Sequence, residues 1–385
     1  MSMRKICVVI NSRANYARIK SVLQELKKDN NCELQIVVGA SGLLFRFGNV
    51  VDVIRNDGFL VNREVYSVVE GNEPIVMAKT TGLALLELSQ VFNDLKPDLV
   101  LTVADRHETI ATAIAASYMN IAVAHTQGGE VTGSIDESVR HACTKLSNLH
   151  FPATQNAYKN IIQMGEDKNK VFLTGCPALD IAEKYRFEDA NQVLDKYLEN
   201  SKDFKGKEYL LVLFHADTHH YKETPKSILE ILKSVSKLDL PTIWLWPNVD
   251  AGTDLISKEL RRFRELNPES KIRFIRNFSP EEYIKILNNA ACIIGNSSSG
   301  IREASRTGTP SVILGSRQRG REFADNVIYV ENIVSSEIID SVNIQMKHGK
   351  YSPSDLYGDG TAGKKIAKVL LEADLSIEKK FIEID

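Results

Sequence analysis

The chain has 385 residues, of which 43% are hydrophobic and 25% are charged, and its formal net charge at pH 7 is −2. This length allows two domains with separate cores, and the composition is typical of a soluble globular protein. The balanced charge offers no basic field for nucleic acid or an anionic membrane surface, so we expect neither as a partner.

The cysteines point to a reducing environment. Five are dispersed along the chain and none forms a C-x-x-C pair, which favours reduced thiols in a cytoplasmic protein over a disulfide framework. The apolar stretch 110–124 is interrupted by Ser117, Tyr118 and Asn120. It is therefore too short to span a membrane.

Short apolar runs alternate with amphipathic stretches in the first half of the chain. Bounded by turn signals and separated by helices, such runs predict a parallel sheet covered on both faces. We expect strands at 6–10, 34–39, 98–103, 121–125, 150–154 and 171–175, and helices near 15–28, 108–119, 134–146 and 155–163.

The alternation stops over the charged stretch 181–208, which we interpret as a linker with a surface helix, and then restarts. The predicted fold class is α/β, with two doubly wound, Rossmann-like parallel-sheet domains facing a cleft. The expected domains are 1–180 and 181–361, and a last helix within 362–385 could pack back on either. The second set of strands is expected at 209–215, 242–246, 271–275, 291–296, 310–315 and 327–330, with helices near 225–236, 253–265, 280–289, 299–306 and 335–347.

A serine-rich turn follows the expected strand 291–296, in the sequence GNSSSGIREASRTGTP (295–310). Backbone N–H groups and the hydroxyls of Ser297 and Ser298 at a helix N-terminus favour phosphate. Glu303 lies about one turn inside the expected helix, within reach of a ribose diol. The alternative is an ordinary serine N-cap. The turn matches neither a P-loop nor G-x-G-x-x-G.

Ionisable and amide side chains gather at the expected carboxyl ends of two neighbouring strands. Ligands bind at this edge of an open α/β sheet, and converging carboxylates suit general acid–base catalysis. The alternative is a set of ordinary rim charges with an i,i+4 ion pair on the next helix. The side chains are Asp105 and Arg106 after the first strand, His125, Gln127 and Glu130 after the second, and Asp136 and Arg140 on the next helix.

Other strand ends carry single candidates. The stretch HADTHH (215–220) raises the possibility of a metal, but no second cluster of ligands accompanies it, so no metal site is predicted. His215 is instead expected to contact substrate. Arg13 ends the first strand, Asn248 and Asp250 follow strand 242–246, and Arg321 could neutralise phosphate.

Together these motifs resemble the hydrolysing UDP-N-acetylglucosamine 2-epimerases, in the right order over nearly the whole chain. The resemblance implies a two-domain GT-B fold, an active site in the interdomain cleft and a nucleotide held mainly by the C-terminal domain. It rests on SRANY (12–16), ADRHE (104–108), HTQGGEVTGSIDESVRHA (125–142), GCPALD (175–180), PNVDAG (247–252), GNSSSGIRE (295–303), GSRQRGRE (315–322) and YGDG (357–360).

The resemblance further implies a two-stage reaction that needs neither NAD nor a metal, and no other cofactor. Removal of the C2 proton expels UDP and gives 2-acetamidoglucal; water then adds and releases N-acetylmannosamine. It also implies a homodimer or homotetramer, through the N-terminal domain. The implied roles are acid–base catalysis for Asp105 and Asp136, with Glu130 and Gln127 beside them; contact with sugar or phosphate for His215; diphosphate binding for Ser297, Ser298 and Arg321; ribose binding for Glu303; and other substrate contacts for Arg13, His125, Asp180, Asn248 and Asp250.

Four residues depart from the family pattern. Gln127 stands where a catalytic glutamate is usual, and an amide cannot exchange a proton at neutral pH. That role is then dispensable here or supplied by Glu130 or Asp136. Asn15, Gly42 and Val103 replace an aspartate and two histidines, also on the sugar side.

The nucleotide side matches the family better than the sugar side does, which leaves other functions open. The first is the same reaction on a UDP- or GDP-linked 2-acetamido or 2,4-diacetamido-6-deoxy sugar, on the way to a nonulosonic acid. Lower alternatives are a GT-B glycosyltransferase and a catalytically silent nucleotide-sugar sensor.

Overall fold

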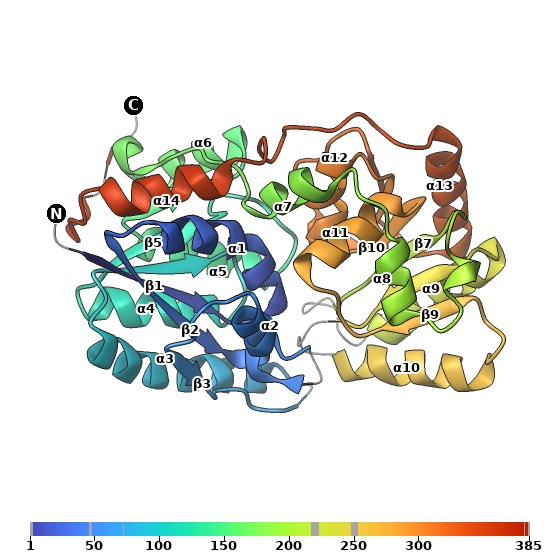
Figure 1. Cartoon of the computed structure of the whole chain (residues 1–385), viewed down its shortest axis with the longest axis horizontal. Coiled ribbons are helices and arrows are strands. Elements are labelled where there is room, and N and C mark those ends of the chain that lie inside the picture. The colour runs from blue at the N-terminus through green and yellow to red at the C-terminus, as the bar shows by residue number, and fades with distance from the viewer. Residues whose placement is uncertain are drawn as a thin grey trace.

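The computed structural model describes residues 3–45, 48–71, 73–216, 223–247, 253–380 and 382–383, in two α/β units that lie side by side (Figure 1). The N-terminal unit has a six-stranded parallel sheet in the order β3-β2-β1-β4-β5-β6, and the C-terminal unit has another in the order β12-β11-β10-β7-β8-β9. Both are the doubly wound order 3-2-1-4-5-6. The predicted fold class is therefore confirmed.

Every strand except β3, which was not predicted, lies close to a predicted position. The first sheet contains β1 (Arg4–Ile10), β2 (Cys32–Gly39), β3 (Arg63–Val65), β4 (Leu99–Val103), β5 (Ala122–Thr126) and β6 (Leu149–Phe151), and the second contains β7 (Leu210–Leu213), β8 (Thr242–Leu245), β9 (Ile272–Ile275), β10 (Cys292–Gly295), β11 (Ser311–Leu314) and β12 (Val327–Val330).

Helices cover both faces of each sheet, because successive strand residues point to opposite faces. On β1, Ile6 and Val8 join one core cluster with α1 and α14, whereas Cys7 and Val9 join another with α3, α4 and α5. The helices are α1 (Arg13–Lys28), α2 (Val50–Asn56), α3 (Pro74–Leu95), α4 (Thr109–Tyr118), α5 (Ile135–Leu146), α6 (Gln155–Gln163), α7 (Ala178–Tyr185), α8 (Asn191–Tyr197), α9 (Thr224–Leu238), α10 (Thr253–Leu266), α11 (Pro280–Asn289), α12 (Arg302–Thr307), α13 (Ser335–His348) and α14 (Ala362–Glu372).

The chain passes between the two units at two neighbouring places. The backbone N–H of Cys176 donates to the carbonyl of Tyr357 at 2.7 Å. Gly175 and Gly358 both have positive φ, and a Cβ on Gly175 would lie 2.9 Å from the Cα of Gly358. Both positions therefore require glycine. The strand predicted at 171–175 is wrong: only Val171 forms an isolated bridge, because the chain then leaves the first sheet.

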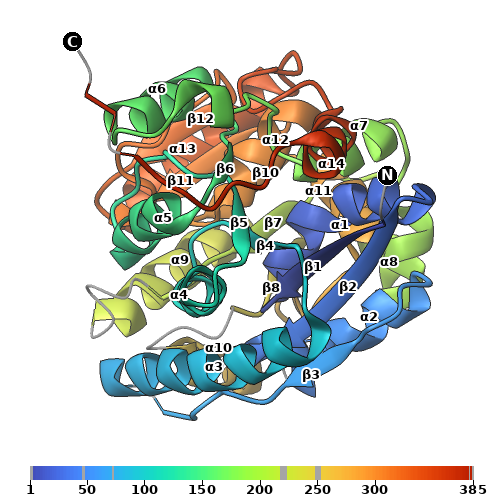
Figure 2. The same cartoon turned by 90° about the vertical axis from the view of Figure 1, so that its left-hand side faces the viewer.

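Helix α14 lies against α1 of the N-terminal unit (Figure 2). Its residues Ala362, Ile366 and Leu370 belong to the core cluster of that unit. The carboxylate of Asp180 accepts the backbone N–H groups of Ala362 and Gly363 at 2.9 and 2.6 Å. Asp180, expected to bind substrate, instead caps this helix, because free N–H groups at a helix start need acceptors.

No element was predicted over 44–97, where the structure places α2, β3 and α3. Helix α3 is 22 residues long and is apolar enough to cross a membrane by length and composition alone. It lies along α4, with Ala84, Leu88 and Phe92 in the core. One such helix is weak evidence for a membrane span, since the core helix of a globular protein passes the same test.

Candidate active site

A cavity lies between the two units, where the strand order of each sheet reverses. Helix α1, which follows β1, contributes Arg13, Tyr16 and Arg18 to its lining. His215 after β7 and the serine turn after β10 line it from the C-terminal unit. These are the switch points at which doubly wound sheets bind ligands.

The serine turn brings hydroxyl groups to the cavity. A short 3-10 turn, η6 (Ser298–Gly300), precedes α12, which starts at Arg302 and has only 6 residues. The groups that this turn offers to an anion are therefore the hydroxyls and Arg18, rather than a long helix dipole. Arg18 donates to the hydroxyl of Ser298 at 2.7 Å, and Ser297 also lines the cavity.

Glu303 and Tyr283 complete this side of the cavity. The hydroxyls of Tyr283 and Ser299 lie 2.5 Å apart. Glu303 lines the cavity, and its buried Oε2 has no hydrogen-bond partner among the described residues. A buried polar atom without a partner is costly. This carboxylate is thus available to accept hydroxyl groups from a ligand.

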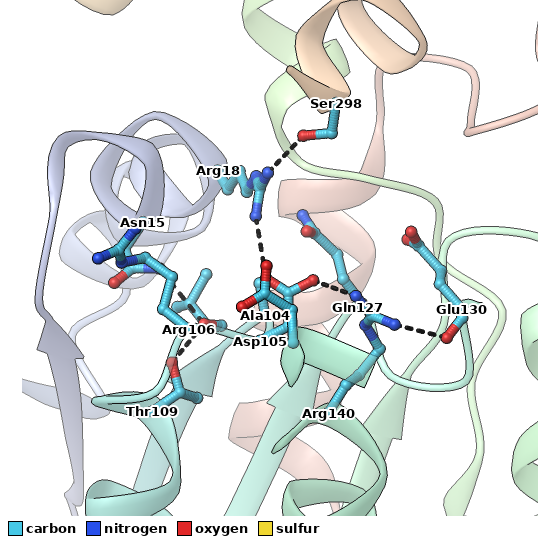
Figure 3. A network of polar contacts seen from close by, with 12 residues as sticks. Asn15, Arg18, Ala104, Asp105, Arg106, Thr109, Gln127, Glu130, Arg140 and Ser298 are labelled. Atoms are coloured by element: carbon cyan, nitrogen blue, oxygen red, sulfur yellow. Dashed lines mark hydrogen bonds and ion pairs between the residues drawn. The ribbon is translucent and has the colours of Figure 1, made fainter. Parts of the chain in front are cut away.

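Asp105 lies at the end of β4, beyond Arg18 (Figure 3). Arg140 pairs with one carboxylate oxygen, and Arg18 lies 3.9 Å from the other. Burial alone would raise the pKa of Asp105, but Arg140, Arg18 and Arg321 lower it well below its usual range. Asp105 therefore remains a carboxylate, joined to the cavity through Arg18.

Glu130 pairs with two arginines of the C-terminal unit, Arg302 and Arg321. Burial would raise the pKa of Glu130, but these arginines and Arg140 lower it. Arg321, expected at the diphosphate, binds this carboxylate, 191 residues away in the chain, and its side chain is 3% exposed.

Gln127 and His125 lie behind the site. Gln127 donates to the sulfur of Cys176 at 3.1 Å, and its Oε1 has no partner among the described residues. His125, expected to contact substrate, has a fully buried ring, with Nε2 2.7 Å from the carbonyl of Ala104 and Nδ1 3.4 Å from the hydroxyl of Thr144. Ala104 has φ 60°, so His125 holds a strained turn next to Asp105.

This buried ring predicts acid sensitivity. Burial lowers the pKa of His125 from 6.5 to about 4, so the unfolded chain takes up a proton between these pH values and the folded chain does not. The contribution of this ring to the free energy of unfolding is therefore fully present above pH 6.5. It decreases as the pH falls, and about 3 kcal/mol is lost at pH 4. Urea unfolding at pH 7, 6, 5 and 4 measures this. His125→Asn should flatten the slope and the exposed His348→Gln should not; equal slopes in all three proteins would contradict the assignment.

Asp136 lies in the first turn of α5, on the side of the site towards segment 316–321. The backbone N–H of Asp136 donates to the hydroxyl of Ser134, the N-cap, at 3.3 Å. Its partly exposed carboxylate lies 3.6 Å from a guanidinium nitrogen of Arg317. Of the candidate carboxylates on the sugar side, Asp136 is thus more accessible than Asp105 or Glu130.

Two more predicted residues lie at the cavity: Arg13 joins the two units, whereas His215 is held within the C-terminal unit. Arg13 donates to the carbonyls of Trp246 and Arg276 at 2.8 and 2.9 Å, and burial lowers its pKa to about 10. The backbone of His215 exchanges two hydrogen bonds of 2.8 Å with the side chain of Asn296. The predicted residues Asn248 and Asp250 lie outside the described residues.

Arg18, Tyr283 and Asn296 were not predicted. An arginine on an amphipathic helix usually faces solvent, so nothing in the local pattern of α1 singles out Arg18. Within the described ranges, no group of three or more His, Cys, Asp or Glu side chains could hold a metal ion. The arrangement offers hydroxyls and arginine for an anion, and carboxylates beside it.

Comparison with known proteins identifies the family. The model of the UDP-N-acetylglucosamine 2-epimerase family matches residues 24–371. The chain is 33% identical to UDP-N,N'-diacetylbacillosamine 2-epimerase (hydrolyzing) of Legionella pneumophila, over 96% of both chains. It is also 33% identical to GDP/UDP-N,N'-diacetylbacillosamine 2-epimerase (hydrolyzing) of Campylobacter jejuni, over 88% of this chain and 86% of that one. The UDP-N-acetylglucosamine 2-epimerase of Neisseria meningitidis is 26% identical over the full length of both.

Solved structures agree on the fold. A Neisseria meningitidis UDP-GlcNAc 2-epimerase bound to UDP-GlcNAc gives a TM-score of 0.77 at 20% identity, covering 96% of this chain and 100% of that one. The Methanocaldococcus jannaschii enzyme in complex with UDP-GlcNAc and UDP gives 0.79 at 19%, covering 95% and 99%. At these identities the likeness supports the GT-B-like fold alone. With the family match over most of its length, the chain belongs to the UDP-N-acetylglucosamine 2-epimerase family.

Proposed function

We propose that the chain is a hydrolysing 2-epimerase of a nucleotide-linked 2,4-diacetamido-2,4,6-trideoxyhexose, of which UDP-N,N'-diacetylbacillosamine is the type. The observation that carries the proposal is the 33% identity to two relatives named for this sugar, against 26% to the Neisseria relative named for UDP-N-acetylglucosamine. The departures from the family pattern on the sugar side support it.

The residues that depart from the family pattern are uncharged and buried. Gln127, Asn15 and Val103 are all buried. The amide of Asn15 donates to the carbonyl of Val103 at 3.3 Å and its oxygen accepts the backbone N–H of Asn11 at 3.1 Å. An aspartate could not donate to that carbonyl. A sugar with an acetamido group in place of a hydroxyl and a methyl group in place of a hydroxymethyl group needs fewer charged partners, which agrees with this neutral surrounding.

The first chemical stage is elimination. A carboxylate removes the proton from C2, the C1–O bond breaks and the diphosphate leaves, so that a C1–C2 double bond forms. We assign the proton transfer to Asp136, because Asp105 is held by arginines. Arg18, between Asp105 and Ser298, stabilises the charge that develops on the departing diphosphate.

The second stage is hydration. The oxygen of water adds to C1 and a proton adds to C2 from the opposite face, which gives the free 2-epimer and leaves the nucleoside diphosphate as the other product. Ser297 and Ser298 would hold the diphosphate, and the unpartnered oxygen of Glu303 would accept the ribose hydroxyls. No step requires a cofactor.

Proton NMR in D2O with a panel of nucleotide sugars tests the proposal. We expect UDP-N,N'-diacetylbacillosamine to give the free epimer, deuterated at C2, and UDP, with kcat/KM at least about 100-fold above that for UDP-N-acetylglucosamine, which lacks the 4-acetamido group that the site would hydrogen-bond. Comparison of the UDP-linked with the GDP-linked sugar shows which nucleotide base the enzyme prefers.

Other outcomes assign other functions. A clear preference for UDP-N-acetylglucosamine, with N-acetylmannosamine and UDP as products, would reject the sugar and keep the reaction. A nucleotide-linked epimer would make the enzyme non-hydrolysing. Transfer of the sugar to an acceptor would make it a glycosyltransferase, and tight binding without turnover would make it a sensor.

We also propose that the chain forms a homo-oligomer through the N-terminal unit. Helix α3 carries the exposed apolar side chains Ile75, Leu83 and Leu86, and exposed Tyr118 ends the adjacent α4. An extended apolar face of this kind is typical of a surface buried between subunits. Sedimentation velocity of the full chain tests the proposal, and a monomer at micromolar concentration would reject it.

A further inference from the structure

Three buried charged side chains from the two units meet beside the site. We propose that Glu130 is a positioning residue that holds the serine turn of the C-terminal unit in register with the catalytic segment of the N-terminal unit. This inference rests on the proposed function, in which the diphosphate binds at that turn and proton transfer occurs on the other side.

The contacts are confined to one carboxylate oxygen. Oε2 of Glu130 accepts from a guanidinium nitrogen of Arg302 at 2.5 Å and also from Arg321. The side chains of Glu130, Arg302 and Arg321 are 3%, 1% and 3% exposed. The main chain is fixed as well, because Arg140 donates to the carbonyl of Glu130 at 2.6 Å (Figure 3). Among the described residues, no other acidic side chain forms an ion pair with Arg302 or Arg321.

Glu130, Arg302 and Arg321 form a charged triad, and their positions show which segments it connects. Glu130 lies between Gln127 and Asp136, in the segment that links β5 to α5. Arg302 is the first residue of α12, next to Glu303 and directly after the turn with Ser298. One side chain thus connects the segment that carries Asp136 to the turn assigned to the diphosphate.

The backbone packing around the triad is close. A Cβ on Gly133 would lie 2.1 Å from the carbonyl oxygen of Ser316, and one on Gly320 would lie 3.0 Å from Val131. The β5–α5 segment therefore lies directly on the segment after β11. Without the charge of Glu130, Arg302 and Arg321 would face each other here unneutralised, and separation of the units would relieve the repulsion.

Glu130 is poorly suited to the catalytic role expected for it. Its carboxylate is engaged by two guanidinium groups, which lower its pKa and favour the ionised form. A proton donor must hold its proton near neutral pH, and a base this tightly paired is weak. A charge that positions the turn explains these contacts without any proton transfer.

Glu130→Gln tests the inference, with Glu166→Gln as the matched control. Glu166 is another buried carboxylate, paired with Lys145 and Lys379 and hydrogen-bonded to His150, but it lies wholly within the N-terminal unit. For Glu130→Gln we expect a larger radius of gyration in small-angle X-ray scattering of the free protein and about 100-fold lower kcat, with an unchanged shape of the pH profile. The control should show neither change.

The double variant Glu130→Gln/Arg321→Gln separates positioning from catalysis. Removing one arginine restores part of the charge balance, so kcat should recover about tenfold from that of Glu130→Gln and the radius of gyration should return towards the wild-type value. A catalytic acid or base could not be replaced in this way. If Glu130→Gln does not fold, as its melting temperature would reveal, Glu130→Asp takes its place, because it keeps the charge on a shorter side chain.

Three outcomes would overturn the inference: an unchanged radius of gyration in Glu130→Gln, loss of one limb of the pH profile, or a double variant no more active than the single one. The scattering measurement uses no substrate, so it decides the positioning role even if the wild-type chain turns over none of the nucleotide sugars, a result that would reject the proposed function instead.

Discussion

Asp136→Asn is expected to lower kcat by about 10³-fold while UDP binding changes less than about threefold. General acid–base catalysis contributes about 10²–10⁴-fold in rate, and an asparagine amide cannot take up or release the C2 proton. Asp136 projects from the N-terminal unit and is partly exposed, whereas the serine turn assigned to the diphosphate belongs to the C-terminal unit. The loss should therefore appear in kcat and hardly in nucleotide affinity. Initial rates of UDP release and titration calorimetry with UDP measure the two effects.

The control for this variant is Glu337→Gln. Glu337 also lies in the first turn of a helix, the exposed start of α13, so the substitution removes the same favourable charge at a helix N-terminus. Its kcat should equal that of the wild type. Solvent deuterium at C2 of recovered substrate adds a second readout, because Asp136→Asn should incorporate none. If Asp136→Asn keeps more than a tenth of the wild-type kcat, another group removes the proton.

The fold was predictable because the alternation of short apolar runs with amphipathic stretches indicates it. β1, β10 and the other central strands are short apolar runs between amphipathic helices, and a parallel sheet buried on both faces imposes that pattern. Segment 171–175 has the same composition but leaves the sheet to cross between the units, a tertiary effect that local sequence does not contain. Helix α3 went unpredicted because its apolar residues lie on more than one face: Leu88 is buried, whereas Leu86 is 70% exposed.

The candidate site was predictable only in part, for a related reason. Ser298 and Glu303 follow a strand end, and the topology of a doubly wound sheet brings strand ends to one cleft. The partners of ionic groups could not be predicted in this way, because they come from distant segments. Glu130 pairs with Arg302, 172 residues away, and Arg18 contacts Ser298, 280 residues away. No local motif contains that information, so a side chain expected to bind substrate can prove to bind another part of the protein.

Asp105→Asn is expected to reduce both stability and turnover. Arg140, whose side chain is fully buried, would lose its carboxylate partner, and an unpaired buried charge costs about 3–5 kcal/mol. Arg18 would lose the carboxylate 3.9 Å away that, together with Ser298, orients it at the cavity. Because Arg18 is assigned to the departing diphosphate, kcat should fall by about 10²–10³-fold, the usual loss when one stabilising group is removed from a transition state. Urea unfolding and the initial rate of UDP release measure the two losses.

The two losses have different origins and can be separated. Asp105→Asn/Arg140→Met removes the unpaired cation, so the double variant should recover most of the lost stability, as replacement of a whole buried ion pair by apolar groups often does. It should not recover kcat, because Arg18 still lacks its partner. Glu166→Gln, which disturbs a buried ionic cluster away from the cavity, should lose stability and keep kcat. Recovery of both properties in the double variant would mean that Asp105 serves only to neutralise Arg140, and that Arg18 needs no carboxylate beside it.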